Sequence, residues 1–208
     1  VDGSIDNAHL ADDAVDSDEL AAGSVDAAHL ASGVGGSWVK LQSTTASSSS
    51  EVDMETGIGS TYDVYMVTIA NMHIQTDDTD LTIRLKIGGA YQTASNYNYH
   101  IRRAHSAGGT PADVSHTAEA QMRLTDAGGN ATSEALSGIV YLYATSGTTN
   151  NKMITAQLAF SDTSGNANNA YGGGGYDENT YSELTGIRFY MSSGNIASGL
   201  FTLYGLAK

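Results

Sequence analysis

The sequence contains no cysteine, one proline, one tryptophan and nine Lys and Arg residues among 208. Without cysteine there are no disulfide bonds, and the redox compartment is left undetermined. The formal net charge is −14. Phosphate binding needs clustered basic residues, so this charge argues against nucleic acid and anionic membranes as partners. Membrane insertion is not expected either, because no apolar run reaches the length of a membrane span.

Motifs that carry catalysis are missing as well. No Gly-x-Ser-x-Gly elbow occurs, and the glycine run 172–175 lacks the Lys-Ser/Thr that completes a phosphate loop, so we interpret it as flexible loop backbone. Paired carboxylates of the glycosidase type can come from strands far apart in the sequence, so the sequence does not exclude such a pair. We therefore expect no enzymatic activity and no cofactor.

Metal binding is not predicted from the spacing of ligand-type residues. The six histidines show no metal-ligand spacing. Residues Asp77, Asp78 and Asp80 lack the glycine and distal glutamate of a calcium loop, and we interpret them as a solvated hairpin turn. The alternative ion site is an oligomer axis lined by His9 and His29.

A ten-residue repeat occupies the start of the chain, beginning at Gly3, Asp13 and Gly23. Apolar residues recur at every fifth position, which fits neither the 3.6-residue period of a helix nor the two-residue period of a strand. Each repeat is therefore predicted to combine an extended piece with a tight turn. The apolar positions are Ile5, Leu10, Val15, Leu20, Val25 and Leu30.

A single copy of this segment cannot order itself, because six buried side chains do not offset the conformational entropy of some thirty residues. Equivalent segments around a common axis supply the missing contacts, and cyclic homo-oligomers are common. We predict a three-fold stalk over residues 1–36, with the six apolar positions and Trp38 at the contacts. The alternative is a disordered Ala/Asp/Ser/Gly linker. The sequence opens within a repeat and without an initiator Met, so we expect it to be part of a longer or processed chain.

Residues 37–208 are predicted to form an all-β head. The segment 81–87 alternates, which places Leu81, Ile83, Leu85 and Ile87 inside and Thr82, Arg84 and Lys86 toward water or a neighbouring subunit. Further strands are predicted at 38–41, 51–56, 62–74, 97–103, 118–124 (with a short helix as the alternative), 138–143, 153–160, 187–191 and 200–206. Loops or polar bridges are expected at 43–50, 105–116, 126–134 and 161–183. This spacing of short strands and turns predicts a jelly-roll-like antiparallel β-sandwich.

Both ends of the chain resemble a known family. Repeats of the form Ile/Val-Asp-x-Ala-His-Leu-Ala-x-Gly resemble the shaft repeats of bacteriophage tail fibres and related virion fibres. The segment 186–206, with Ile-Arg-Phe, Ser-Gly-Asn and Leu-Tyr-Gly, is similar to the closing strands of the trimeric β-sandwich heads on such fibres. The resemblance implies a homotrimeric virion protein, assembled in the host cytoplasm and joined to other tail proteins upstream. It implies this architecture more strongly than any receptor.

Recognition is expected from tyrosine-rich segments. The segment 170–181 combines Tyr with Gly, Asn and Asp, as antibody paratopes do, and such surfaces also suit sugars. We expect multivalent adhesion to a host surface glycan or outer-membrane component. The candidate receptor-binding residues are Tyr91, Tyr97, Tyr99, Tyr171, Tyr176, Asp177, Asn179 and Tyr181.

Other readings of these segments and of the whole chain stay open. The tyrosine-rich segments could instead cap the sandwich or pack between subunits. For the whole chain, the alternatives are a structural virion fibre or connector without receptor binding and, third, a polysaccharide depolymerase.

Overall fold

The computed structural model describes residues 37–105, 112–143, 149–177 and 182–208. The chain divides between Ser37 and Trp38, so the description below concerns the unit that begins at Trp38. The apolar positions of the predicted stalk, Ile5, Leu10, Val15, Leu20, Val25 and Leu30, lie outside the described residues. Three-fold association through them stays a prediction.

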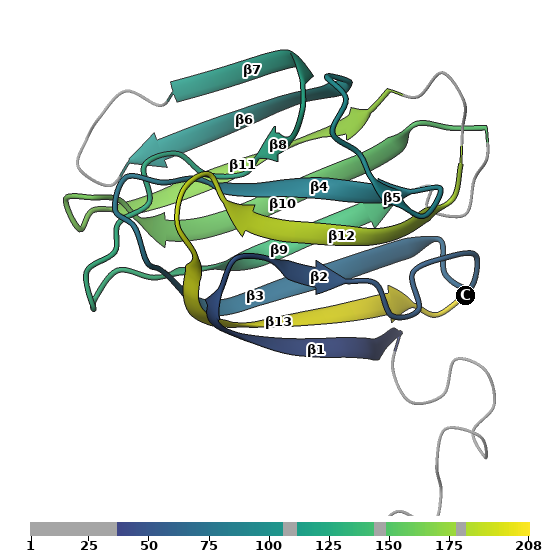
Figure 1. The fold of residues 1–208 in the computed structure, drawn as a ribbon, viewed down its shortest axis with the longest axis horizontal. Coiled ribbons are helices and arrows are strands. Elements are labelled where there is room, and N and C mark those ends of the chain that lie inside the picture. The colour runs from purple at the N-terminus through teal and green to yellow at the C-terminus, as the bar shows by residue number, and fades with distance from the viewer. Residues whose placement is uncertain (1–36, 106–111, 144–148, 178–181) are drawn as a thin grey trace, which may run out of the picture. The chain divides into compact units, whose positions relative to one another are not determined.

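The unit from Trp38 onward consists of antiparallel strands in two sheets (Figure 1). The large sheet has the order β1 (Trp38–Ser49), β13 (Ile196–Leu206), β3 (Val64–Ile74), β9 (Leu136–Tyr143), β10 (Lys152–Ser161), β11 (Ala167–Tyr176), β6 (Tyr97–His105) and β7 (Ala112–Glu119). The small sheet has the order β2 (Val52–Met54), β12 (Leu184–Met191), β4 (Leu81–Ile87) and β5 (Ala90–Tyr91), and β8 (Met122–Arg123) pairs with β4. No helix occurs in the described ranges, and the all-β prediction is confirmed for them.

The core lies between the two sheets. Leu81, Ile83 and Leu85 on β4 are fully buried and Ile87 is nearly so, which confirms the predicted inward face. The large sheet contributes alternate residues in the same way, as the period of a strand requires. The rings of Phe189 on β12 and Phe201 on β13 lie 5.3 Å apart and join the two layers.

Strand pairing is nested along the chain. The first strand pairs with the last (β1 with β13), the second with the next to last (β2 with β12), β3 with β9, and β4 with β8. Strands β10, β11, β6 and β7 then continue the large sheet beyond β9. Partners far apart in sequence are thereby brought side by side.

The prediction of a polar bridge at 43–50 is wrong, because β1 continues to Ser49 and pairs with β13 along its length. A strand at the edge of a sheet pairs with one neighbour only. A segment rich in Ser and Thr can form such a strand without a strong alternation of apolar residues. Thr82 is also not solvent-facing. It is buried, and its hydroxyl donates to the carbonyl oxygen of Tyr190 at 2.8 Å.

The long loop predicted at 161–183 is wrong over β11, whose glycines 172–175 lie centrally between β10 and β6. Glycine has low strand propensity. Here, however, a Cβ at Gly172 or Gly174 would overlap the backbone of His100 or Asn98 on β6. Packing therefore outweighs propensity. The prediction of a loop at 105–116 is also wrong in part, because β7 begins within it. The strand predicted at 118–124 is confirmed in part, because the end of β7 and all of β8 lie within it.

The turn between β10 and β11 is organised by the Asp162 carboxylate. It accepts hydrogen bonds from the backbone nitrogens of Ser164 (2.9 Å) and Asn166 (3.0 Å) and from Nδ2 of Asn168 (3.1 Å). Burial by itself would raise the pKa of Asp162, but these hydrogen bonds outweigh burial and lower the pKa to about 2. The carboxylate therefore stabilises the folded chain in its charged form.

We expect Asp162→Asn to lower the free energy of unfolding at pH 7 by about 1–3 kcal/mol, because one acceptor of buried donors is lost. The folded pKa lies below the ordinary value of 3.8. The wild-type advantage should therefore be present above about pH 4 and disappear as the pH falls toward 2. Urea unfolding followed by circular dichroism across this range measures it. The exposed Asp63→Asn is the control, and a deficit independent of pH would contradict the prediction.

Candidate functional site

The structure separates the predicted receptor-binding residues into three groups. The rings of Tyr97, Tyr99 and Tyr176 are buried, Tyr91 is half-buried in a network of charged groups, and Tyr171 and Asp177 are exposed. Asn179 and Tyr181 lie outside the described residues. The eight candidates therefore do not form one continuous surface in the described chain.

The buried tyrosines join β6 and β11 to the small sheet. The hydroxyl of Tyr97 accepts from the backbone nitrogen of Leu85 at 2.8 Å and donates to the carbonyl oxygen of Gln92 at 3.3 Å. Tyr176 packs edge-on against Tyr97, with ring centroids 4.9 Å apart. These rings offer no exposed face to a ligand. The alternation of Tyr97, Tyr99 and Ile101 on one side of β6 was the sequence signal that could have identified a core face.

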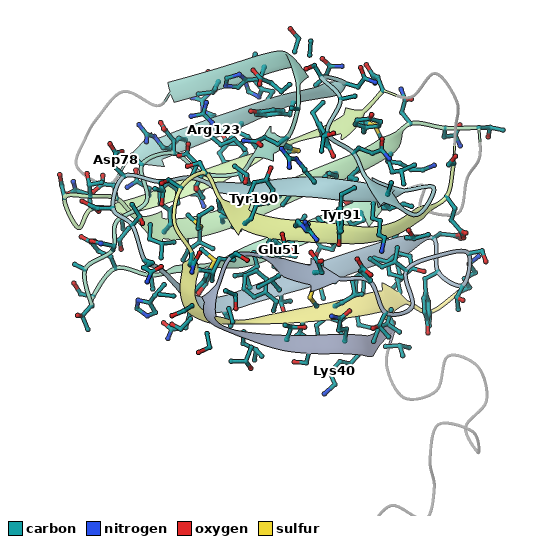
Figure 2. The ribbon with its side chains drawn as sticks, in the orientation of Figure 1. Lys40, Glu51, Asp78, Tyr91, Arg123 and Tyr190 are labelled. Carbon is teal, nitrogen blue, oxygen red and sulfur yellow. The ribbon has the colours of Figure 1, made fainter. Side chains whose placement is uncertain are left out.

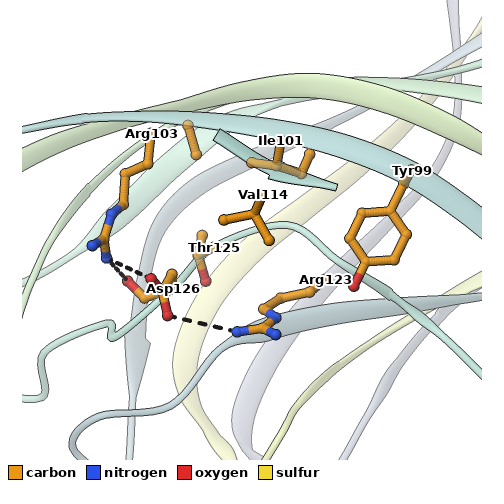
Figure 3. A pocket seen from close by; sticks show the side chains of 8 residues that line it. Tyr99, Ile101, Arg103, Val114, Arg123, Thr125 and Asp126 are labelled. Carbon is orange, nitrogen blue, oxygen red and sulfur yellow. Dashed lines mark hydrogen bonds and ion pairs between the residues drawn. The ribbon is translucent and has the colours of Figure 1, made fainter. Parts of the chain in front are cut away.

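A small cavity lies between β6, β7 and the segment that follows β8 (Figure 3). Tyr99, Ile101 and Val114 form its apolar wall. Its volume of about 20 Å³ leaves room for about one water molecule. A sugar does not fit in this space.

The charged groups around this cavity pair with one another. Arg103 lies 2.9 Å from the Asp126 carboxylate, and Arg123 lies 3.6 Å from Asp126 and 3.4 Å from Asp80. The Asp77–Asp80 turn is likewise held internally, since Asp77 and Asp80 accept from the backbone nitrogens of Asn130 and Ala127. We interpret both sets as structural.

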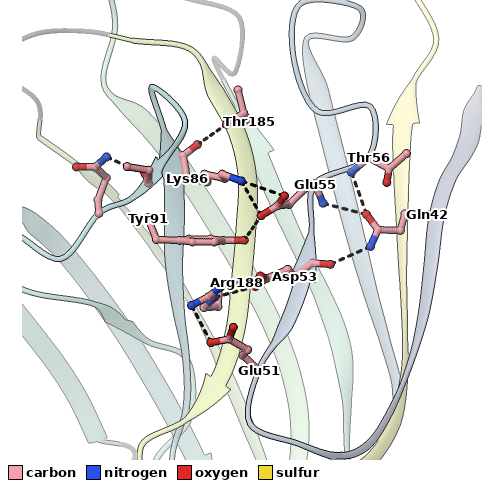
Figure 4. Close-up of polar contacts among 11 residues, drawn as sticks. Gln42, Glu51, Asp53, Glu55, Thr56, Lys86, Tyr91, Thr185 and Arg188 are labelled. Atoms are coloured by element: carbon pink, nitrogen blue, oxygen red, sulfur yellow. Dashed lines mark hydrogen bonds and ion pairs between the residues drawn. The ribbon is translucent and has the colours of Figure 1, made fainter.

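A charged network covers the outer face of the small sheet, where Figure 2 places Glu51, Tyr91 and Tyr190. It comprises Glu51, Asp53, Glu55, Lys86, Tyr91 and Arg188 (Figure 4). The Arg188 guanidinium binds both oxygens of Asp53 at 2.8 and 2.7 Å and one oxygen of Glu51 at 2.7 Å. It also lies over the Tyr91 ring, 4.0 Å from the centroid.

Tyr91 is fully engaged in this network. Its hydroxyl donates to Glu55 Oε1 at 2.7 Å, and Lys86 Nζ lies 3.0 Å from the same carboxylate. Burial, followed by the hydrogen bond to Glu55, raises the pKa of Tyr91, while the Tyr91 hydroxyl lowers the pKa of Glu55. The network thus links β2 and β5 to β4 and β12. We therefore interpret Tyr91 as a structural residue.

The exposed candidates lie on the outer face of the large sheet. One cross-strand row runs Gln157, Tyr171, Arg102 and Asp113 across β10, β11, β6 and β7, and the adjacent row runs Thr155, Gly173, His100 and Ser115. We call these two rows the Tyr171 strip. Directly opposed side chains in a sheet have Cβ atoms about 4.5–5.5 Å apart, so neighbours within a row can contact one ligand together.

The strip combines an open aromatic ring with donors and an acceptor. Tyr171 is 46% exposed, and Arg102 Nη1 donates to Asp113 Oδ2 at 3.4 Å. His100 Nε2 lies 3.7 Å from Asp113 Oδ1, with both side chains about half exposed. Gly173 adds no side chain between Thr155 and His100. A Cβ at this position would lie 2.6 Å from the carbonyl oxygen of Ile154 on β10, so close approach of the neighbouring backbone explains this glycine.

Asp177 lies just beyond the end of β11. Its carboxylate accepts from Nδ2 of Asn98 at 2.6 Å and from Nδ2 of Asn151 at 3.0 Å. It is therefore fixed in position but remains exposed. Sequence reasoning missed Arg102, Asp113, His100 and Gln157 as neighbours of Tyr171, because their proximity depends on the pairing of β10, β11, β6 and β7.

No family model, curated protein or solved structure matches this chain. Within the described ranges, no group of three or more His, Cys, Asp or Glu side chains is placed to hold a metal ion. In the same part of the chain, no helix has the length and apolar character needed to cross a membrane. The functional assignment therefore depends on the chemistry of the chain's own surface.

We expect Tyr91→Phe to lower the free energy of unfolding by about 1–2 kcal/mol, because Glu55 loses a charge-assisted hydrogen bond. In a double-mutant cycle with Glu55→Gln the two effects should be non-additive, since the residues are in contact. Urea unfolding measures both values. Tyr171→Phe is the matched control and should leave stability unchanged. Additive effects of Tyr91→Phe and Glu55→Gln would show that the pair is not coupled.

Proposed function

We propose that this chain is the distal part of a homotrimeric bacteriophage tail fibre, whose head adheres to a glycan on the host surface. The observation that carries the adhesive role is the Tyr171 strip, an exposed ring beside polar side chains on paired strands. The fibre assignment is supported by the resemblance of the repeats and of the closing strands. The protein would then act as part of a virion, assembled in the host cytoplasm and attached to upstream tail proteins.

The head of this fibre would be a jelly roll. In that fold a long hairpin of paired strands is rolled so that successive pairs alternate between two sheets. The nested pairing supports this topology, since β1–β13 and β3–β9 belong to the large sheet and β2–β12 and β4–β8 to the small one. Strands β10, β11, β6 and β7 extend one sheet, and they carry the Tyr171 strip.

Sugar binding follows from the chemistry of the strip. The ring of Tyr171 would stack on the apolar C–H face of a sugar, while Arg102 and Gln157 donate to its hydroxyl groups and Asp113 accepts from them. Side chains held on a sheet lose little freedom on binding, so more of the contact energy contributes to affinity. Each site would bind weakly. Three sites per head, and several fibres per particle, would raise the avidity through effective concentration.

We expect Tyr171→Ala to weaken binding of the full chain to host cells and to glycans on an array by at least about tenfold, a loss of about 1.4 kcal/mol. The loss should follow from removal of the stacking surface, because Tyr171 is not part of the core. Tyr171→Phe keeps the ring and should retain most of the binding. Binding by Tyr171→Ala that equals the wild type would contradict the assignment of the strip.

A structural fibre or connector is the second candidate. The observation that favours it is an outer surface on β13, β3, β9 and β10 without charged groups, which could contact another virion protein. A connector should bind neither host cells nor glycans in the assay above. Release of reducing ends from host polysaccharide by the full chain would instead indicate a depolymerase.

A further inference from the structure

Four adjacent strands of the large sheet, β13, β3, β9 and β10, contain almost no charge. Apart from Lys152, which is fully buried, none of their residues is Asp, Glu, Lys or Arg. We call the outward side of these four strands the uncharged face. The small sheet covers the inward side, so the uncharged face is the side turned away from the core.

The uncharged face carries aromatic and thioether side chains in register. Tyr204, Met66 and Tyr141 form one cross-strand row, and Tyr143 opposes Met153 in the next. The rings of Tyr141 and Tyr143 are stacked, with centroids 6.3 Å apart. Met153 is 50% exposed. Tyr and Met are enriched, and acidic and lysine residues depleted, in the cores of protein interfaces.

Two other outer surfaces of the described head are charged. The small sheet carries the charged network around Arg188, and the Tyr171 strip carries His100, Arg102 and Asp113. The whole chain has a formal net charge of −14. Copies of such a chain repel one another, and close contact between them is least unfavourable where neither copy presents a carboxylate. The charge distribution therefore points to a second copy as the occupant of the uncharged face.

Trp38 connects this face to the start of the head. Its ring lies 6.1 Å from that of Tyr141, and it pairs with Leu206 on β13. Trp38 directly follows Ser37, the last residue of the first unit. Copies that associate through the repeats would bring their Trp38 residues, and with them this edge of the uncharged face, close to one another.

We infer that the uncharged face is the surface through which the heads of this protein associate with one another. The inference rests on the proposed homotrimer and names the part of the head that makes the contact. The face spans four strands spaced about 4.8 Å apart, and the shortest of them has 8 residues. At about 3.3 Å per residue this gives roughly 500 Å². A standard interface buries about 800 Å² per partner. The head contact is thus smaller than a self-sufficient interface and acts together with association through the repeats.

The test compares the full chain with Met153→Glu and with Gln75→Glu. Both variants add one negative charge at an exposed position. Met153 lies in one row with Tyr143 and Val64, at the start of β3, whereas Gln75 lies beyond the opposite end of β3. We expect Met153→Glu to raise, by at least about tenfold, the concentration at which light scattering finds half of the chains dissociated. Gln75→Glu should leave that concentration unchanged. Equal midpoints for the three proteins would overturn the inference.

A photo-crosslinking residue at position 153 provides a second readout that does not require dissociation. Irradiation of the full chain should join two copies through the uncharged face, whereas the same residue at position 75 should not. An oligomer that crosslinks at neither position would overturn the inference and leave the homotrimer standing. A wild-type chain that is monomeric throughout would overturn both. The adhesion proposal is judged separately, by the binding of Tyr171→Ala.

Discussion

The head depends on the burial of alternate apolar side chains between two sheets of unequal width. The small sheet is too narrow to cover the inner face of all the strands opposite it, and the segment around β8 supplies further cover through the buried Met122 and Leu124. Tyr97 on β6 also reaches the small sheet, where its hydroxyl accepts a hydrogen bond from the backbone nitrogen of Leu85 on β4. This packing buries the inward-facing groups, so the proposed recognition would use the outer faces.

The outer faces are chemically distinct although they belong to one small unit. On the small sheet, every labelled charge of the network in Figure 4 has an opposite charge or a hydroxyl beside it. Such half-buried networks fix strands in place and leave little free binding capacity. The large sheet instead presents an uncharged face and the Tyr171 strip side by side. The two meet on β10, whose Thr155 and Gln157 belong to both, so the proposed association and adhesion would use neighbouring parts of one sheet.

The sequence was informative where a pattern is local. The two-residue period of 81–87 predicted the buried face of β4, and the apolar runs at 138–143 and 153–160 predicted β9 and β10. It failed where pairing decides the structure. The serines of β1 and the glycines of β11 have no strong preference for a strand. The first segment is a strand because it pairs with β13, and the second because it pairs with β10 and β6. For the same reason, Tyr171 could be named in advance, while its neighbours Arg102 and Asp113 could not.

The position of Tyr171 on a strand has an energetic consequence for the proposed adhesion. A loop that closes on a sugar must lose backbone freedom, which costs about 1–2 kcal/mol for each residue ordered. Tyr171 is already held between Gln157 and Arg102 by the ladder of β11, and this cost is met when the chain folds. In the proposed function, a weak stacking contact would then suffice for measurable binding if several copies acted together. Association through the uncharged face would supply that condition, because it would hold the copies of the strip at a fixed spacing. The proposed adhesion would then depend on the proposed association.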